Sequence, residues 1–228
     1  GKKPLIEKYS IHLQEGDPEC IGHPKLYSHV FLDKLFDELG LEDFFRSYKG
    51  FSKIQYDVLN FTRLLVYGRI LNPDSKIATL EQNNDYYTPL LKNFNKYNVY
   101  DTLDFIYENK EKIIRRMNTS LVKKWHRNPE IIFYDVTNFF FETSDPDEDI
   151  FDEDGNIIET GIRKMGVSKE NRKQPIVQMG LFMDDQGLPI SIEVFPGNTL
   201  DANTFKPAIS KSVDGLDYAR FIMIGDRG

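Results

Sequence analysis

The sequence is poor in several features, and each scarcity excludes a class of protein. Cys20 is the one cysteine among 228 residues, which excludes an internal disulfide framework and favours a reducing compartment such as the cytosol. No apolar run approaches the roughly 20 residues that cross a bilayer, and the N-terminus has no signal-peptide pattern. The four histidines show no metal-ligand spacing, so we interpret them as structural residues.

Acidic residues outnumber basic ones, and the acidic excess is unevenly distributed. The formal net charge is −7. Residues 1–130 hold 20 Lys and Arg and 18 Asp and Glu. Residues 131–228 hold 9 Lys and Arg and 18 Asp and Glu. The acidity therefore belongs to the second half. Because bound metal ions can neutralise an acidic patch, this charge does not by itself exclude a polyanionic partner.

The first half predicts helices. Apolar residues recur at helical spacing over residues 30–39, followed by Gly40 as a C-cap, and again over residues 58–70, ending near the dipeptide Asn72-Pro73. The same dipeptide can begin the next helix, with asparagine as N-cap and proline at the first position. A third pattern covers residues 103–125. We interpret the basic residues within it as a solvated helix face rather than a DNA-contact stripe: Arg115, Arg116, Lys123 and Lys124.

Beyond residue 128 the composition changes to short runs of β-branched and aromatic residues, which predict strands. Asp184 to Gly187 form a turn signal between two of these runs, and Asp201 is a candidate N-cap. The predicted order is strand, strand, strand, helix, strand, with which a ribonuclease H-like domain begins. The runs cover residues 131–141, 176–183 and 188–195, then the helix 201–212 and a last strand 219–225.

We therefore expect an α+β protein with two regions. Residues 1–128 form a helical N-terminal region, and residues 129–228 form an incomplete ribonuclease H-like α/β domain. An acidic loop at residues 142–160 interrupts the second region; it holds nine acids. No glycine falls at the sixth position of a calcium-loop pattern, so the segment is predicted to be a mobile, solvated excursion.

Two aspartates, Asp135 and Asp226, follow apolar runs that predict the first and last strands. In the expected fold these strands are parallel neighbours, so residues 91 positions apart in the sequence come together. Two close carboxylates repel each other unless a proton or a cation neutralises them. Mg²⁺ prefers such oxygen ligands, and two ions roughly 3.5–4 Å apart would activate the attacking oxygen and stabilise the leaving oxygen of a phosphodiester.

Several segments resemble successive motifs of the DDE transposases of bacterial insertion sequences. The resemblance is closest to the large group whose catalytic domain carries a strand-rich insertion. The GRILNPDSK stretch at residues 68–76 also resembles that group's helical N-terminal region. The four motifs are YDVTN at 134–138, GVSKENR at 166–172, FPGNTLD at 195–201 and IGDRG at 224–228.

The resemblance implies that Asp135 and Asp226 are the first two catalytic, metal-binding aspartates, with Mg²⁺ as cofactor and Mn²⁺ as its substitute. Water would cleave a phosphodiester at the element's end, and the freed 3′-hydroxyl would then attack target DNA. The implied partners are double-stranded DNA at terminal inverted repeats and at the target, in the bacterial cytoplasm at the nucleoid, and a homodimer is compatible with bridging two ends. The family's third acid, a glutamate, lies well downstream of the second aspartate. No residue follows Gly228 here, so we expect this N-terminal portion to be inactive.

Several interpretations remain open. Ser168, Lys169 and Arg172 either clamp a DNA phosphate or anchor a loop, and Arg227 either contacts a phosphate or pairs with the preceding aspartate. Asp135 could instead cap a local turn. The whole chain could be a non-catalytic remnant that binds DNA or dimerises. A metal-free glycosidase with two carboxyl groups is a further alternative, weakened because no sugar-binding aromatic platform was expected near the first aspartate.

Overall fold

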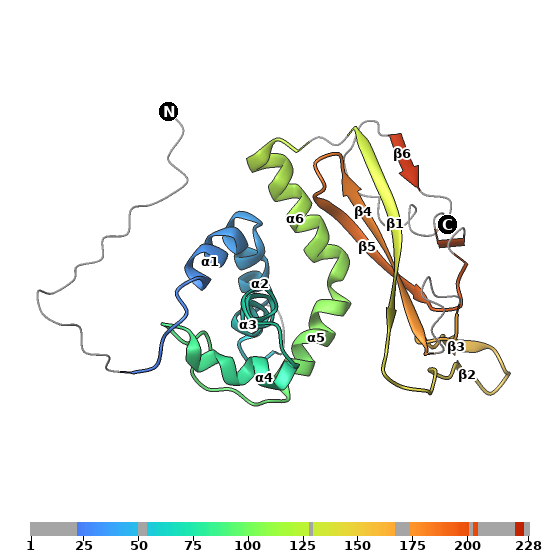
Figure 1. Ribbon diagram of the computed structural model, residues 1–228, viewed down its shortest axis with the longest axis horizontal. Helices are drawn as coiled ribbons and strands as arrows, with labels where there is room; N and C mark the ends of the chain where they lie inside the picture. Colours follow the sequence, from blue (N-terminus) through green and yellow to red (C-terminus); the bar gives the residue numbers. More distant parts are fainter. Residues whose placement is uncertain are drawn as a thin grey trace, which may run out of the picture.

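The computed structural model describes residues 22–49, 54–127, 130–166, 174–200, 203–204 and 222–225. A helical part precedes a sheet part in the chain, and the two lie side by side (Figure 1), as the α+β prediction requires. The helices are α1 His29–Glu38, α2 Leu41–Lys49, α3 Val58–Leu71, α4 Lys76–Glu81, the 3₁₀ helix η1 Gln82–Asp85, α5 Asn98–Glu108 and α6 Lys110–Trp125. The strands are β1 Ile131–Phe140, β2 Ile150–Phe151, β3 Ile157–Glu159, β4 Ile176–Asp184, β5 Pro189–Pro196 and β6 Ile222–Gly225.

The first two predicted helices are confirmed as α1 and α3. Gly40 has φ +73°, the left-handed conformation that ends a helix and that glycine adopts without strain. The prediction for Asn72-Pro73 as the start of the next helix is wrong. Asn72 instead ends α3, because its N–H donates to the Gly68 carbonyl, and the Ser75 hydroxyl caps α4 by accepting the Ala78 N–H at 3.2 Å.

The third predicted helix is divided into α5 and α6 at Asn109. The side-chain amide of Asn109 is buried and donates to the Phe105 carbonyl at 2.9 Å. A side chain that binds the backbone in this way competes with the regular helical hydrogen bond, and the chain turns here. Among the basic residues of this pattern, Arg116 is not simply solvated, since its guanidinium donates to the Gly40 carbonyl and contacts Asp43.

The helical part encloses its own aromatic core. Phe45 lies at its centre, with ring centroids 6.1 Å from Phe36 and 5.9 Å from Phe105, and Phe61, Leu64 and other side chains complete the cluster. Full burial of side chains of this size contributes about 1.5–3 kcal/mol each. Within the described residues, no helix has both the length and the apolar character that crossing a bilayer requires.

The main sheet has the strand order β5-β4-β1-β6. The β1–β4 and β4–β5 pairs are antiparallel, whereas β1 and β6 are parallel. The predicted adjacency of the first and last strands is therefore confirmed, and Gly187 with φ +77° forms the predicted turn between β4 and β5. Of the predicted helix at 201–212, residues 203 and 204 are helical, and Asp201 with the rest lies outside the described residues.

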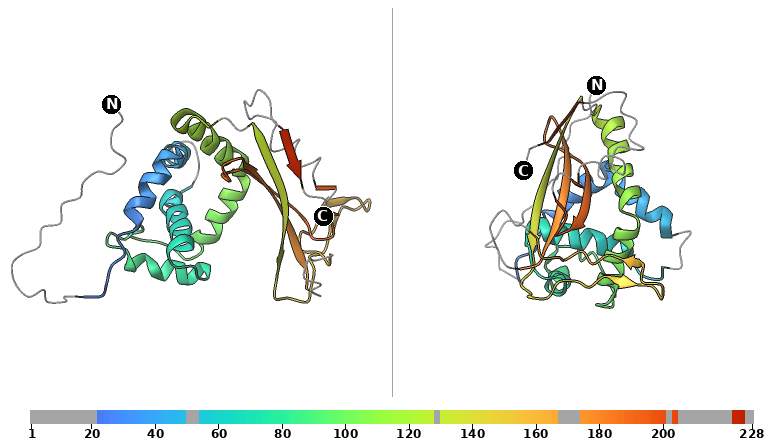
Figure 2. Two further views of the ribbon diagram at one scale, coloured as in Figure 1. Left: turned by 45° about the horizontal axis from the view of Figure 1, so that its top comes forward. Right: turned by 90° about the vertical axis from the view of Figure 1, so that its right-hand side faces the viewer.

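Helix α6 joins the helical part to the sheet along the edge strand β5 (Figure 2). Buried Arg127 follows the helix and pairs with buried Asp184 at 2.8 Å. The same guanidinium donates to the side-chain oxygen of Asn118 and to the carbonyls of Leu188 and Pro189, at 2.7 to 3.0 Å. This network satisfies both buried charges and fixes the β4–β5 turn against the helix.

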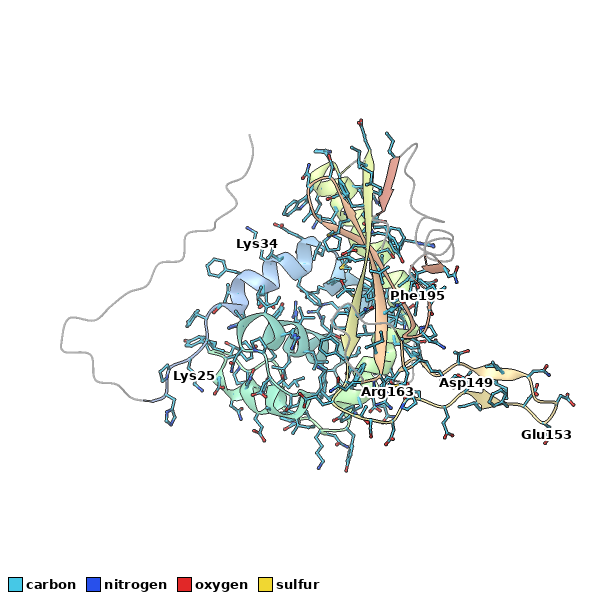
Figure 3. The ribbon with its side chains drawn as sticks, turned by 45° about the vertical axis from the view of Figure 1, so that its right-hand side comes forward. Lys25, Lys34, Asp149, Glu153, Arg163 and Phe195 are labelled. Carbon is cyan, nitrogen blue, oxygen red and sulfur yellow. The ribbon has the colours of Figure 1, made fainter. Side chains whose placement is uncertain are left out.

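The acidic excursion forms a hairpin rather than the predicted mobile loop. We call residues 147–164 the acidic arm, in which β2 and β3 pair antiparallel and project from the molecule (Figure 3). Arg163 binds Asp147 and Lys164 binds Asp149 at the base of the arm, and these hydrogen bonds hold the pKa of both carboxyls below the usual range. At the tip, Asp152 accepts the backbone N–H groups of residues 154 and 156, which shapes the turn.

Candidate metal centre on the sheet

Asp135 lies in the middle of β1, opposite Leu181 of β4. Its neighbours Tyr134 and Val136 are buried on one face, so the alternation of a strand places the aspartate on the other, exposed face. This carboxylate therefore bears no cost of burial. The alternative in which it caps a turn is wrong, because it belongs to a continuously paired strand.

The parallel register between β1 and β6 is the central geometric feature of the site. Ile131 pairs with Ile222, and the register continues to Tyr134 opposite Gly225. In the sequence, the next residue after Tyr134 is Asp135, and the next after Gly225 is Asp226. Asp226 itself lies outside the described residues.

The four residues predicted to contact DNA, Ser168, Lys169, Arg172 and Arg227, also lie outside the described residues. Two of the motif segments nevertheless meet. A Cβ atom on Gly166 would lie 1.8 Å from the Gly197 carbonyl oxygen, so only glycine permits this backbone contact. The Gly197 N–H donates to the Ile162 carbonyl at 3.1 Å, so this motif segment has a structural role as a turn.

Contacts on the covered face of the sheet, opposite Asp135, hold strand β1 in place. Tyr134 and Thr204 share a buried hydrogen bond of 2.8 Å between their hydroxyl groups. A Cβ atom on Gly180 would lie 2.4 Å from the Tyr134 hydroxyl, so the absence of a side chain there makes room for the ring. Sequence reasoning missed Tyr134, Gly180 and Thr204, although a tyrosine at an inward strand position signals the need for a polar partner.

Apart from the exposed Thr137, the neighbours of Asp135 on its face of the sheet are mostly apolar. Phe133, Phe139, Val194 and Ile224 are partly exposed on it, around the carboxylate. Two partly exposed phenylalanines, Phe133 and Phe139, lie on the same face of β1 as the aspartate. An exposed apolar surface of this kind is typical of a region that other structure or a ligand covers.

The chemistry of Asp135 suits a hard divalent cation. A carboxylate oxygen is the ligand type that Mg²⁺ prefers, and no hydrogen bond or ion pair among the described residues occupies this one. Across the described part of the chain, no three His, Cys, Asp or Glu side chains lie close enough together to hold a metal. Asp135 alone would bind a hydrated ion weakly, so a stable site needs a second carboxylate.

Comparison with known proteins gives structural neighbours only. No protein-family model matches the chain, and no curated protein is similar to it in sequence. It is similar to a Mos1 transposase paired-end complex with left transposon end, with 14% identity over 78% of this chain and 54% of that chain and a TM-score of 0.28. It is also similar to the mariner Mos1 paired end complex with Mg, with 15% identity over 82% of this chain and 60% of that chain and a TM-score of 0.27. The chain thus spans little more than half the length of these transposases. Since the TM-scores are below 0.5, the ribonuclease H-like strand order is assigned from the pairing of the strands in this structure and not from these neighbours.

Proposed function

We propose that this chain is part of a DNA transposase of the DDE type, in which Asp135 and Asp226 bind divalent metal and DNA is cleaved and joined at the exposed sheet face. The proposal rests on one observation: the parallel β1–β6 register reaches Tyr134 and Gly225, each followed in the sequence by an aspartate. One further step of that register would set the two carboxylates side by side. The order of the motifs along the chain supports the same conclusion.

The proposed roles follow from the charge and exposure of the side chains. Asp135 is exposed, so a phosphodiester can approach it without displacing protein. Mg²⁺ held by the two aspartates would stabilise the charge that develops on the attacking and leaving oxygens. Ser168, Lys169, Arg172 and Arg227 would hold DNA phosphates and set the position of the strand. The helical part would recognise the terminal inverted repeats, and two copies would bridge two DNA ends.

The test is Mn²⁺ binding by this chain, followed by electron paramagnetic resonance. We expect Asp135→Asn and Asp226→Asn each to weaken the tightest site by at least about tenfold, since each removes one of two charged ligands. Asp185→Asn is a matched control on the exposed β4–β5 turn, and Asp154→Asn tests competition from the acidic arm. If either control weakens the tightest site as much as Asp135→Asn does, the proposed site is wrong.

A second candidate is a transposase remnant that binds DNA without cutting it. Such a remnant would need no complete set of metal ligands around Asp135. The two functions are separated by incubating an end-labelled duplex with the chain in Mn²⁺. Cleavage that Asp135→Asn abolishes supports the enzyme, whereas salt-dependent binding without cleavage supports the remnant.

A further inference from the structure

The acidic arm exposes apolar side chains on a two-stranded hairpin. Ile150, Phe151, Ile157 and Ile158 are each more than half exposed, the last at 67%. An isolated two-stranded hairpin is only marginally stable in water, so apolar side chains on it need a surface to pack against. The arm therefore has the character of a segment that another surface completes.

A second apolar surface lies on the helical part, next to the sheet. A groove of about 380 Å³ runs between α1, α6 and the start of β5. Its floor and walls are apolar, and Glu38 is the one charged residue that lines it. The apolar side chains that matter here are Leu35, Leu39, Leu121, Trp125, Leu188 and Ile190, of which Trp125 is 53% exposed.

Helix α6, which forms one wall of the groove, carries charge opposite to that of the acidic arm, whereas the α1 wall carries the acid Glu38. Helix α6 carries six Lys and Arg against one Glu, and Arg115, Lys123 and Lys124 are exposed and form no ion pair with the rest of the described chain. The stretch 142–159 holds nine acids and no basic residue. Glu148 and Glu159, beside the exposed apolar strands of the arm, likewise have no ion-pair partner among the described residues.

The two surfaces of one molecule do not meet. In Figure 3 the tip of the arm, marked by Glu153, points away from helix α1, on which Lys34 is labelled. We propose that the acidic arm docks into the α1–α6 groove of a second copy of this chain, so that two copies exchange arms. Apolar contact supplies the association, and the acids of the arm against the cations of α6 select the orientation. This interface deepens the homodimer of the proposed function but requires neither metal nor DNA.

Sedimentation velocity over a range of protein concentrations tests the proposal. We expect a reversible dimer whose Kd rises at least about tenfold in the arm variant Phe151→Ser/Ile158→Ser and in the groove variant Trp125→Ala. Tyr107→Ala is the matched control, because Tyr107 is 75% exposed on α5 and belongs to neither surface. A chain that stays monomeric at all concentrations overturns the proposal, as does a dimer that both variants leave unchanged.

Charge reversal tests the pairing of the two surfaces directly. We expect two double variants each to dimerise several-fold more weakly with copies of themselves: the α6 variant Lys123→Glu/Lys124→Glu and the arm variant Glu148→Lys/Glu159→Lys. An equimolar mixture should recover the dimer, since in the mixed dimer every arm meets a groove of opposite charge. A mixture that stays weak overturns the proposal, and so does a lysine variant that loses DNA affinity but associates normally. Asp135→Asn should still dimerise, so loss of metal binding and loss of the interface are distinguishable.

Discussion

The helical part and the sheet part bury their apolar residues differently. The helical part surrounds a closed aromatic cluster that includes Phe36, Phe45 and Phe105. The sheet buries Ile132, Tyr134 and Val136 on one face but leaves Phe133 and Phe139 partly exposed on the other. One part therefore has a core of its own, whereas the other has one covered and one open face.

This difference in burial suggests that the helical part contributes mainly to stability and that the open face of the sheet part serves ligand binding. The candidate metal ligand Asp135 lies on the open face of the sheet, and the acidic arm also arises from the sheet part. Well-packed regions resist local opening, while regions with fewer buried contacts supply binding surfaces. We expect substitutions in the helical core to act on unfolding, and substitutions on the open face to act on ligands.

The largest effect should come from opening the helical core. Phe45 is 1% exposed and touches three other aromatic rings, so Phe45→Ala should lower the free energy of unfolding by about 3–5 kcal/mol. Urea unfolding followed by circular dichroism measures it. Phe31→Ala is the control, since Phe31 is 66% exposed on α1 and should change stability by less than about 0.5 kcal/mol. Equal effects of the two would contradict the closed core.

A smaller effect should follow at the junction between the two parts. Arg127→Lys keeps a positive charge near Asp184 but loses the planar fork that also reaches Asn118 and the β4–β5 turn. We expect a loss of about 1–3 kcal/mol and separate unfolding of the two parts, seen as non-coincident urea transitions by fluorescence and circular dichroism. Arg115→Lys, on the exposed face of α6, should leave a single transition unchanged.

On the covered face of the sheet the expected effect is smaller still. Tyr134→Phe removes one hydroxyl of the buried pair with Thr204 and should cost about 1 kcal/mol, measured by thermal unfolding. Tyr107→Phe, at an exposed position, serves as the control and should be neutral. A neutral Tyr134→Phe would mean that this hydrogen bond does not help to fix β1.

The smallest effect should be the pH response of the acidic arm. Hydrogen bonds from Arg163 and Lys164 lower the pKa of Asp147 and Asp149, whereas unfolded aspartate titrates near 3.9, so the anchoring is complete above about pH 4 and is lost as the pH falls through the lowered values. Backbone ¹⁵N relaxation should therefore report faster motion of residues 147–164 below about pH 4. In Arg163→Gln the arm should already be mobile at pH 7, and an arm that stays rigid in that variant would contradict the role of the ion pair.

The sequence predicts those parts of the fold that local patterns determine. Helical spacing located α1 and α3, and a run of β-branched and aromatic residues located β1. The order of strands implied that β1 and β6 would be parallel neighbours. Local signals failed where two of them competed, as at Asn72, which ends one helix instead of starting another. They also failed where pairing is distant in sequence.

Pairing across distance explains the remaining differences. Arg127 and Asp184 are 57 positions apart, and nothing near either residue identifies its partner. The acidic arm has a composition typical of a solvated loop, yet Asp147 and Arg163 close its base from opposite ends. For the candidate site, the motif identified Asp135, but its exposure follows from the alternation of β1 in the sheet, in which Tyr134 packs beside Gly180 on the covered face.

The contact between α6 and β5 also sets the direction in which the sheet can grow. Asn118 and Lys110 donate to the carbonyls of Ile190 and Ile192, so side chains of α6 occupy hydrogen-bonding positions that an added strand would use on this edge. At the opposite edge, β6 is paired with β1 alone among the described residues. A further strand would therefore pair with β6. Each added strand would extend the sheet surface on the side of Asp135, away from the edge that α6 covers.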